Sequence, residues 1–205
     1  MRDKPVDTIE YKGKHIDVYY DENTESPREW ENMGTMLCSH RRYNLGDVKE
    51  SKSMATDDIL DYVNRKDVIS LSLYLYDHSG LSMKCSRNGN PWYNAPLPQG
   101  HAEFDSGLVG FIVVTKEKIL KEYSKKRMSK ALVRKAFDLL QSEVEVYSSY
   151  LEGNCYGYEV REFGDSCWGF YGHDYEKNGL LESAQNSIDC GLESLQEEIY
   201  HEVGA

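Results

Sequence analysis

Alternating hydrophobic and polar residues predict β-strands in three parts of the chain. Residues 9–20 alternate on both sides of Lys12-Gly13, which predicts a hairpin. Residues 68–76 place leucines at every second position, the pattern of a strand buried on one face. Residues 156–171 alternate around Gly164 and predict a second hairpin. These stretches indicate a sheet built mainly from antiparallel neighbours.

One stretch, residues 109–114, is apolar without interruption. A run of this kind is typical of a strand covered on both faces, so we expect it at the centre of the sheet.

Apolar residues spaced three and four positions apart predict two long amphipathic helices, one beginning after Ser129 and one near Leu180. Shorter helices are predicted over residues 56–63 and 116–123, the latter capped by Thr115. Strands and helices in this order predict an α+β fold, with a mixed, mainly antiparallel sheet and helices packed on it. We expect residues 1–205 to form a single domain.

The longest stretch without periodic pattern runs from Lys84 to Gly107 and contains three of the five prolines. Loops of this length inside a compact domain are often functional. Trp92 and Tyr93 lie in it, and aromatic anchors of this kind dominate binding energies at interfaces. We expect an interaction element here, and the alternative is a loop folded down on the core.

Charged residues are distributed unevenly along the chain, and this distribution bears most strongly on which partners we expect. The net charge is −11, which disfavours direct binding of nucleic acid through a basic surface. Residues 136–205 hold fifteen acidic residues against Arg161 and Lys177, a net of −13. One interpretation is a solvated acidic surface, and the other is a face that docks on a basic partner. The acidic residues expected to contact such a partner are Glu143, Glu145, Glu152, Glu182, Asp189, Glu193, Glu197 and Glu198.

The cysteine pattern and the absence of known motifs limit the disulfide, metal and cofactor chemistry that we expect. The five cysteines form no CxxC pair, so we expect free thiols in a reducing cytosol rather than disulfides or structural zinc. Cys38-Ser39-His40 is the nearest approach to a nucleophile pair. The sequence has no P-loop, dinucleotide fingerprint, HExxH or GxSxG motif, and we expect no metal or cofactor. No apolar run is long enough for a membrane helix.

Three polar clusters are candidates for a site: residues 40–43, which include Arg41 and Arg42, residues 77–80, and residues 105–107. Asp77, His78, Asp105 and His40 provide groups for acid–base chemistry or for an Asp/His metal site, with the arginine pair for a phosphate. The alternatives are turn chemistry for the Asp, Ser and Gly residues, and neutralisation of neighbouring carboxylates for the arginines.

Several strings taken in order resemble a family of small accessory proteins of bacteriophages and related mobile elements. They are Ser26 to Trp30, His40 to Asp47, Leu75 to Gly80, Asp105 to Phe111 and Asp165 to Gly172. The resemblance implies expression in the cytoplasm of an infected bacterium. Small acidic phage proteins outside the virion often oppose host defence, and antirestriction and anti-CRISPR inhibitors present carboxylates where phosphates would lie.

We therefore expect a non-enzymatic inhibitor that binds a host defence nuclease or nucleic-acid-binding complex through an acidic surface. The alternative is a phosphate-ester hydrolase, or a protein that sequesters a nucleotide, using Asp77, His78, Arg41 and Arg42.

Overall fold

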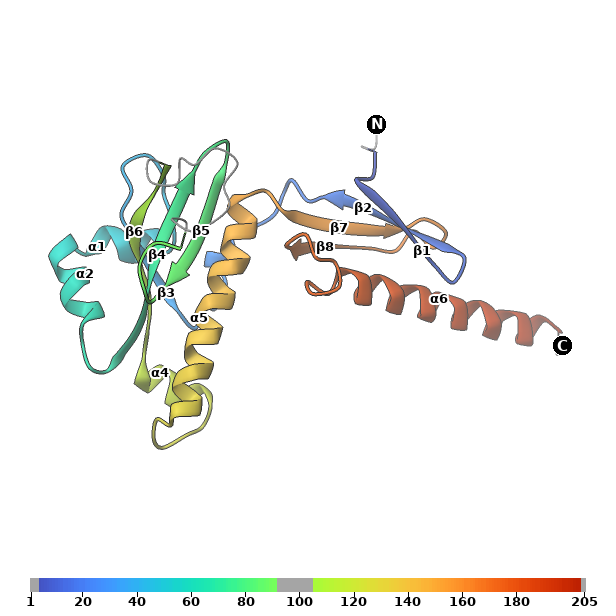
Figure 1. Ribbon diagram of the computed structural model, residues 1–205. Coiled ribbons are helices and arrows are strands. Elements are labelled where there is room, and N and C mark those ends of the chain that lie inside the picture. Colours follow the sequence, from blue (N-terminus) through green and yellow to red (C-terminus); the bar gives the residue numbers. More distant parts are fainter. Residues whose placement is uncertain (1–3, 92–104, 204–205) are drawn as a thin grey trace. The chain divides into compact units, whose positions relative to one another are not determined.

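The computed structural model describes residues 4–91 and 105–203, with side chains as far as residue 197. The chain divides into two compact units, whereas the sequence predicted one domain (Figure 1). Unit 1 comprises residues 1–24 and 153–205, and unit 2 comprises residues 25–152. Each unit has its own sheet and its own core. The chain passes from one unit to the other after residues 24 and 152. Neither point is marked by a Gly- or Pro-rich linker, so the composition did not reveal the boundaries between the units.

Unit 1 is a four-stranded antiparallel sheet with one long helix against it. The strand order is β1-β2-β7-β8, with β1 at Asp7–Tyr11, β2 at Lys14–Tyr20, β7 at Cys155–Val160 and β8 at Ser166–Tyr171. Helix α6 (Leu180–Val203) lies along one face of this sheet (Figure 1). Its buried side, Leu180, Ala184 and Ile188, packs against Ile16, Val18, Tyr156, Tyr158 and Val160.

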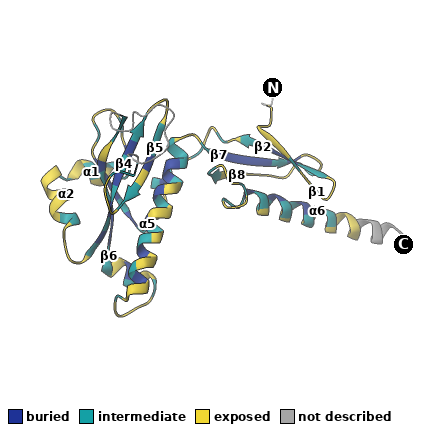
Figure 2. Ribbon diagram, viewed as in Figure 1, coloured by how far each residue is buried: buried dark blue, intermediate teal, exposed yellow. Residues whose placement is uncertain are grey.

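Unit 2 is also built on a four-stranded antiparallel sheet, with order β3-β6-β4-β5. Its strands are β3 (Thr35–Cys38), β4 (Val68–Asp77), β5 (Leu81–Ser86) and β6 (Ser106–Thr115). Its helices are η1 (Pro27–Glu29), α1 (Val48–Ser53), α2 (Thr56–Val63), α4 (Lys116–Glu122) and α5 (Lys130–Leu151). The buried stripe of α5 faces the sheet (Figure 2).

The α+β class and most elements match the sequence prediction. Strand β6 lies between β3 and β4, and the core covers both of its faces, as its unbroken apolar run predicted. Thr115 and Ser129 cap α4 and α5 by accepting backbone N–H groups, also as predicted. Two separate antiparallel sheets replace the one mixed sheet that we expected, because each unit buries its own apolar face.

The predicted loop from Lys84 to Gly107 is shorter than its composition indicated. Strand β5 continues to Ser86, which pairs with Ser72, and β6 begins at Ser106. Trp92 and Tyr93 lie outside the described residues.

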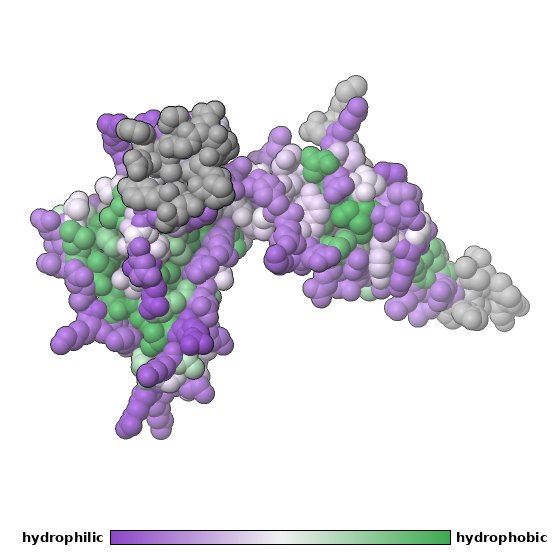
Figure 3. Space-filling model, in the orientation of Figure 1, coloured by the Kyte–Doolittle hydropathy of each residue, from purple (hydrophilic) through white to green (hydrophobic). Residues whose placement is uncertain are grey.

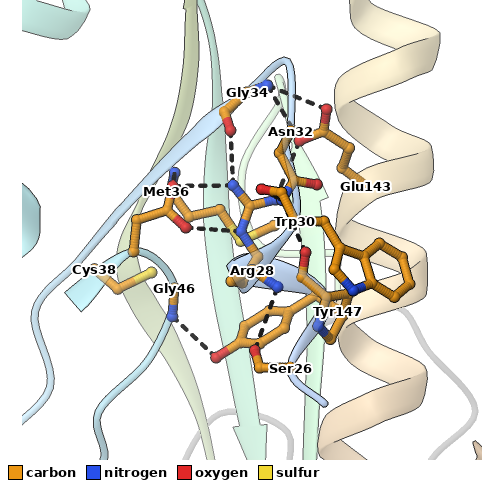
Figure 4. A network of polar contacts seen from close by, with 12 residues as sticks. Ser26, Arg28, Trp30, Asn32, Gly34, Met36, Cys38, Gly46, Glu143 and Tyr147 are labelled. Carbon is orange, nitrogen blue, oxygen red and sulfur yellow. Dashed lines mark hydrogen bonds and ion pairs between the residues drawn. The ribbon is translucent and has the colours of Figure 1, made fainter. Parts of the chain in front are cut away.

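A buried arginine holds the first segment of unit 2 in place (Figure 4). The Arg28 side chain is only 4% exposed. Its Nε and Nη2 donate to the two carboxylate oxygens of Asp47 at 2.9 and 3.0 Å, its Nη1 donates to Glu143 at 3.1 Å, and Nη2 also donates to the Gly34 carbonyl oxygen at 2.7 Å. The two carboxylates hold the pKa of the guanidinium above its ordinary value, against the opposing effect of burial.

The carboxylates of this network also bind backbone groups. Glu143 accepts the N–H groups of Met33 and Gly34, and Asp47 accepts the N–H of Met36 at 2.8 Å. These bonds tie α5, strand β3 and the segment before α1 to one cation. Gly34 is required here, because a Cβ would lie 2.5 Å from Leu140 of α5. The prediction that Glu143 faces a partner is therefore wrong, since its carboxylate is 11% exposed and bound inside unit 2.

Three of the five cysteines lie in or beside the cores. Cys38 and Cys155 are buried, Cys85 is half-buried, and Cys167 and Cys190 are exposed. Burial raises the pKa of Cys38 to about 12 and that of Cys85 to about 11. The Cys38 thiol therefore stays protonated at neutral pH, which argues against a nucleophile at Cys38-Ser39-His40.

We predict that Arg28→Ala lowers the free energy of unfolding by about 3–5 kcal/mol, since it leaves two buried carboxylates without their cation. Chemical denaturation followed by circular dichroism measures the change. Arg65→Ala is the matched control, because Arg65 forms an exposed ion pair with Asp67 and its loss should leave the unfolding midpoint almost unchanged. Equal stability of Arg28→Ala and wild type would show that the network does not support the fold.

We also predict an order of thiol reactivity in the folded protein. Iodoacetamide at pH 8 should alkylate Cys167 and Cys190 first, with Cys38 and Cys155 protected until the chain is denatured. Mass spectrometry of peptides after timed quenching measures the order. Alkylation of Cys38 at the rate of Cys167 without denaturant would contradict the burial seen here.

Candidate functional site

The face of the unit 1 sheet opposite α6 carries the most distinctive surface of the molecule. Because side chains alternate across a strand, burial of Ile16 and Val18 against α6 turns Tyr19 to the opposite face. Tyr19 pairs with Gly157 of β7, and Gly157 pairs with Trp168 of β8. The three residues therefore form a row across three neighbouring strands, with the glycine in the middle.

Gly157 allows the indole of Trp168 to lie over the sheet. A Cβ at Gly157 would lie 2.1 Å from Cε3 of Trp168, so any other residue would displace the ring. The ring centroids of Tyr19 and Trp168 are 6.3 Å apart. Trp168 remains 49% exposed in this position. The row is thus a fixed aromatic platform with one indole face open to solvent.

A β-bulge in β8 gives Trp168 this orientation. Trp168 and Phe170 are two positions apart, and a regular strand would turn both to the same face. The register shifts between the pairs at Tyr156 and Gly157, and Gly169 has a positive φ of 87°. Phe170 therefore packs into the core under α6, while Trp168 lies on the open face. Strict alternation misses this site, and the glycine between two aromatics is the signal that could have indicated it.

A groove with a volume of about 920 Å³ extends over this platform. Tyr19, Tyr20 and Trp168 provide its aromatic lining, and Asp21, Glu22 and Glu159 its carboxylates. Lys4 is the one basic residue among the described residues that line it. Aromatic faces and carboxylates both favour a cation, so the groove has the chemistry to hold a lysine or arginine side chain.

A second cation on this face, Arg161, is already neutralised. Its Nη2 and Nε donate to the carboxylate of Asp17 at 2.7 and 3.0 Å. These bonds hold the pKa of Asp17 below its ordinary value, so the pair stays ionised near neutral pH. Arg161 therefore does not offset the carboxylates of the groove.

The remaining predicted acidic residues lie in different settings. On α6, the side chains of Glu182, Glu193 and Glu197 are exposed, and that of Glu198 lies outside the described residues. Asp189 is bound by Lys12, whose Nζ donates at 2.7 Å. Glu145 and Glu152 are exposed on α5 and at its C-cap, which belong to unit 2 and not to unit 1.

The structure joins the polar clusters suspected of chemistry in unit 2 by two separate sets of contacts. Arg42 forms an ion pair with Asp77, and the Tyr43 hydroxyl donates to the same carboxylate at 3.2 Å. His40 stacks on Tyr43, with ring centroids 4.9 Å apart. Arg42 of the suspected phosphate site is thus bound to a carboxylate of its own chain. This is the alternative in which the arginines neutralise neighbouring carboxylates.

His78 makes the second of these contacts. Its Nδ1 lies 3.1 Å from a carboxylate oxygen of Asp105, which immediately precedes β6. The imidazole is 43% exposed. A carboxylate that orients an accessible histidine is an arrangement used in acid–base catalysis. Among the described residues no three His, Cys, Asp or Glu side chains are grouped to hold a metal ion.

The chain matches no family model, no curated protein and no solved structure. In the described part of the chain, no helix has the length and apolar character needed to cross a membrane.

Proposed function

We propose that this protein is a non-enzymatic binding protein whose acidic unit docks on a basic segment of a nucleic-acid-binding partner. The observation that carries this proposal is the distribution of charge between the units. Unit 1 holds 17 acidic and 6 basic residues, a net of −11, while unit 2 holds 18 of each. The whole net charge of the protein thus falls on 77 residues, which also carry the groove.

The groove supports a basic partner through two kinds of contact. A guanidinium or ammonium group over Trp168 gains a cation–π interaction of about 0.5–2 kcal/mol. The carboxylates of Glu22 and Glu159 at the same surface provide charge-assisted hydrogen bonds. The field of unit 1 would accelerate encounter with a positively charged surface.

Basic surfaces on proteins are commonly nucleic-acid-binding sites, because phosphates require them. Carboxylates presented to such a surface compete with phosphates for the same cations. This reasoning, with the resemblance to phage accessory proteins, favours an inhibitor of a host defence nuclease. The exposed α6 residues Glu182, Glu193 and Glu197 lie on the other side of the sheet and would offer a second, separate acidic contact.

The groove can be tested with a fluorescein-labelled nona-arginine peptide and the full chain. We predict that Trp168→Ala and Gly157→Ala each weaken binding at least tenfold in fluorescence anisotropy, because both remove the aromatic platform. Trp30→Ala is the matched control, since Trp30 of unit 2 is 48% exposed and lies outside the groove. The affinity of the Trp30→Ala variant for the peptide should equal that of the wild-type protein.

The acidic residues of α6 are tested in the same assay. If Glu193→Lys with Glu197→Lys weakens binding and Trp168→Ala does not, the partner contacts α6 rather than the groove. Absence of peptide binding at 50 mM salt would refute acidic docking altogether. Capture from a bacterial lysate, with elution by duplex DNA, should then recover nucleic-acid-binding proteins that share a basic channel.

A phosphate-ester hydrolase is the second candidate, favoured by the His78–Asp105 pair, whose histidine follows Asp77 of the Arg42–Asp77 ion pair in the sequence. If this function is correct, the purified protein hydrolyses labelled nucleotides, and His78→Ala removes that activity without changing the melting temperature. His173→Ala in unit 1 is the matched control, because it removes an exposed histidine far from Asp105 in the sequence. Equal turnover by wild type and His78→Ala would exclude this site.

A further inference from the structure

Unit 2 has no net charge, but one part of its surface is strongly basic. Residues 116–135, which form α4, the following turn and the start of α5, hold nine Lys or Arg residues against Glu117 and Glu122. Their net charge is +7, so the remainder of unit 2 carries −7. We call residues 116–135 the basic hairpin. Its hydrophilic side chains project at the lower end of unit 2 in Figure 3.

Packing of the apolar residues turns these cations outward. Ile119 of α4 and Leu132 and Ala136 of α5 are buried in the core of unit 2. The opposite positions are exposed: Lys121, Lys125, Lys126, Arg127, Lys130, Arg134 and Lys135. In the described part of the chain, no ion pair involves any of these seven residues. The hairpin therefore carries like charges that the protein itself does not compensate, although like charges close together oppose folding.

A polar pocket continues the basic surface along the sheet. Its volume is about 520 Å³, and Lys116 and Val133 of the hairpin form part of its wall. Arg87 lines it with the hydroxyl-bearing residues Ser72 and Ser86, and no carboxylate residue is among the described residues around it. The Arg87 guanidinium lies 3.4 Å from the centroid of the Phe137 ring, which fixes its position. Cations and hydroxyl groups without carboxylates favour an anion.

We propose that the basic hairpin and the Arg87 pocket bind the phosphate backbone of nucleic acid. This surface belongs to unit 2 and does not depend on the function proposed for unit 1. Seven of the nine cations are lysines, which act as point charges toward phosphates rather than as bidentate readers of bases. The binding is therefore independent of base sequence.

The apolar residues of the hairpin argue against an anionic membrane as the ligand. Tyr123 and Met128 lie in the turn region, but both are partly buried against the core of unit 2. A segment that inserts into a membrane surface presents such residues outward. The expectation that this protein does not bind nucleic acid directly came from the total charge of −11, and the division of charge between units removes that argument.

The test uses the full chain and fluorescein-labelled 20-mers, both duplex and single-stranded, in anisotropy titrations from 50 to 200 mM salt. We expect Lys125→Gln with Lys126→Gln and Arg127→Gln to weaken binding at least tenfold at 50 mM salt. The slope of log K against log salt should fall by about 2–3, since each phosphate contact contributes about 0.9. The matched control is Lys49→Gln with Lys52→Gln and Lys66→Gln, which removes three exposed cations of unit 2 outside the hairpin.

The proposal would be overturned by no binding at 50 mM salt or by equal losses of binding in the hairpin and control variants. Hairpin-dependent binding to phosphatidylserine vesicles that exceeds binding to the oligonucleotides would overturn it as well. Loss of a self-associated state in the hairpin variant, measured by sedimentation without nucleic acid, would also overturn it and would assign the surface to the acidic unit of a second copy. Trp168→Ala separates this proposal from the first, because it should leave oligonucleotide binding unchanged while weakening binding of the arginine peptide.

Discussion

Unit 2 depends on one buried cation. Arg28 has lost nearly all contact with water, and such a charge is tolerated only where carboxylates and carbonyls replace its hydration. Asp47, Glu143 and the Gly34 carbonyl do so, and the same carboxylates accept backbone N–H groups that would otherwise be buried without partners. A network of this kind specifies a single arrangement, because displacement of any member leaves a buried charge unsatisfied. It holds β3, an edge strand of the sheet, and helix α5 in one arrangement.

The strings that suggested a phage family meet in pairs in the folded chain. Arg28 of the first string binds Asp47 of the second, Arg42 of the second binds Asp77 of the third, and His78 of the third lies beside Asp105 of the fourth. Much of what makes these strings distinctive is therefore explained by contacts within unit 2. This explanation accounts for Asp77 and Arg42 without catalysis, whereas the exposed pair of His78 and Asp105 retains groups that a reaction could use.

Local sequence patterns predicted most strands and helices. The two-unit organisation and the setting of single side chains depend on contacts between residues far apart in the sequence, which such patterns do not reveal. Alternation and the capping residues Thr115 and Ser129 identified the strands and helices, because these signals act within a few residues. The two-unit organisation depends on pairing between β2 and β7, which are more than a hundred residues apart in sequence. Glu143 followed the same spacing as solvent-exposed acidic residues, and only its meeting with Arg28 shows that it is internal. Trp168 was missed because a bulge at Gly169 reverses the face that alternation assigns to it.

The two units differ most in their charge. A summed charge of −11 describes neither surface, since unit 1 carries all of it and unit 2 balances a basic hairpin against acidic residues elsewhere. Electrostatic interactions in water decay over about 8–10 Å at physiological salt, so a partner responds to the surface it meets rather than to the total. An acidic groove and a basic hairpin on one chain therefore attract groups of opposite charge, each independently of the other. The charge of a partner that binds unit 1 is therefore set by the carboxylates of the groove, and that of a partner that binds unit 2 by the cations of the basic hairpin.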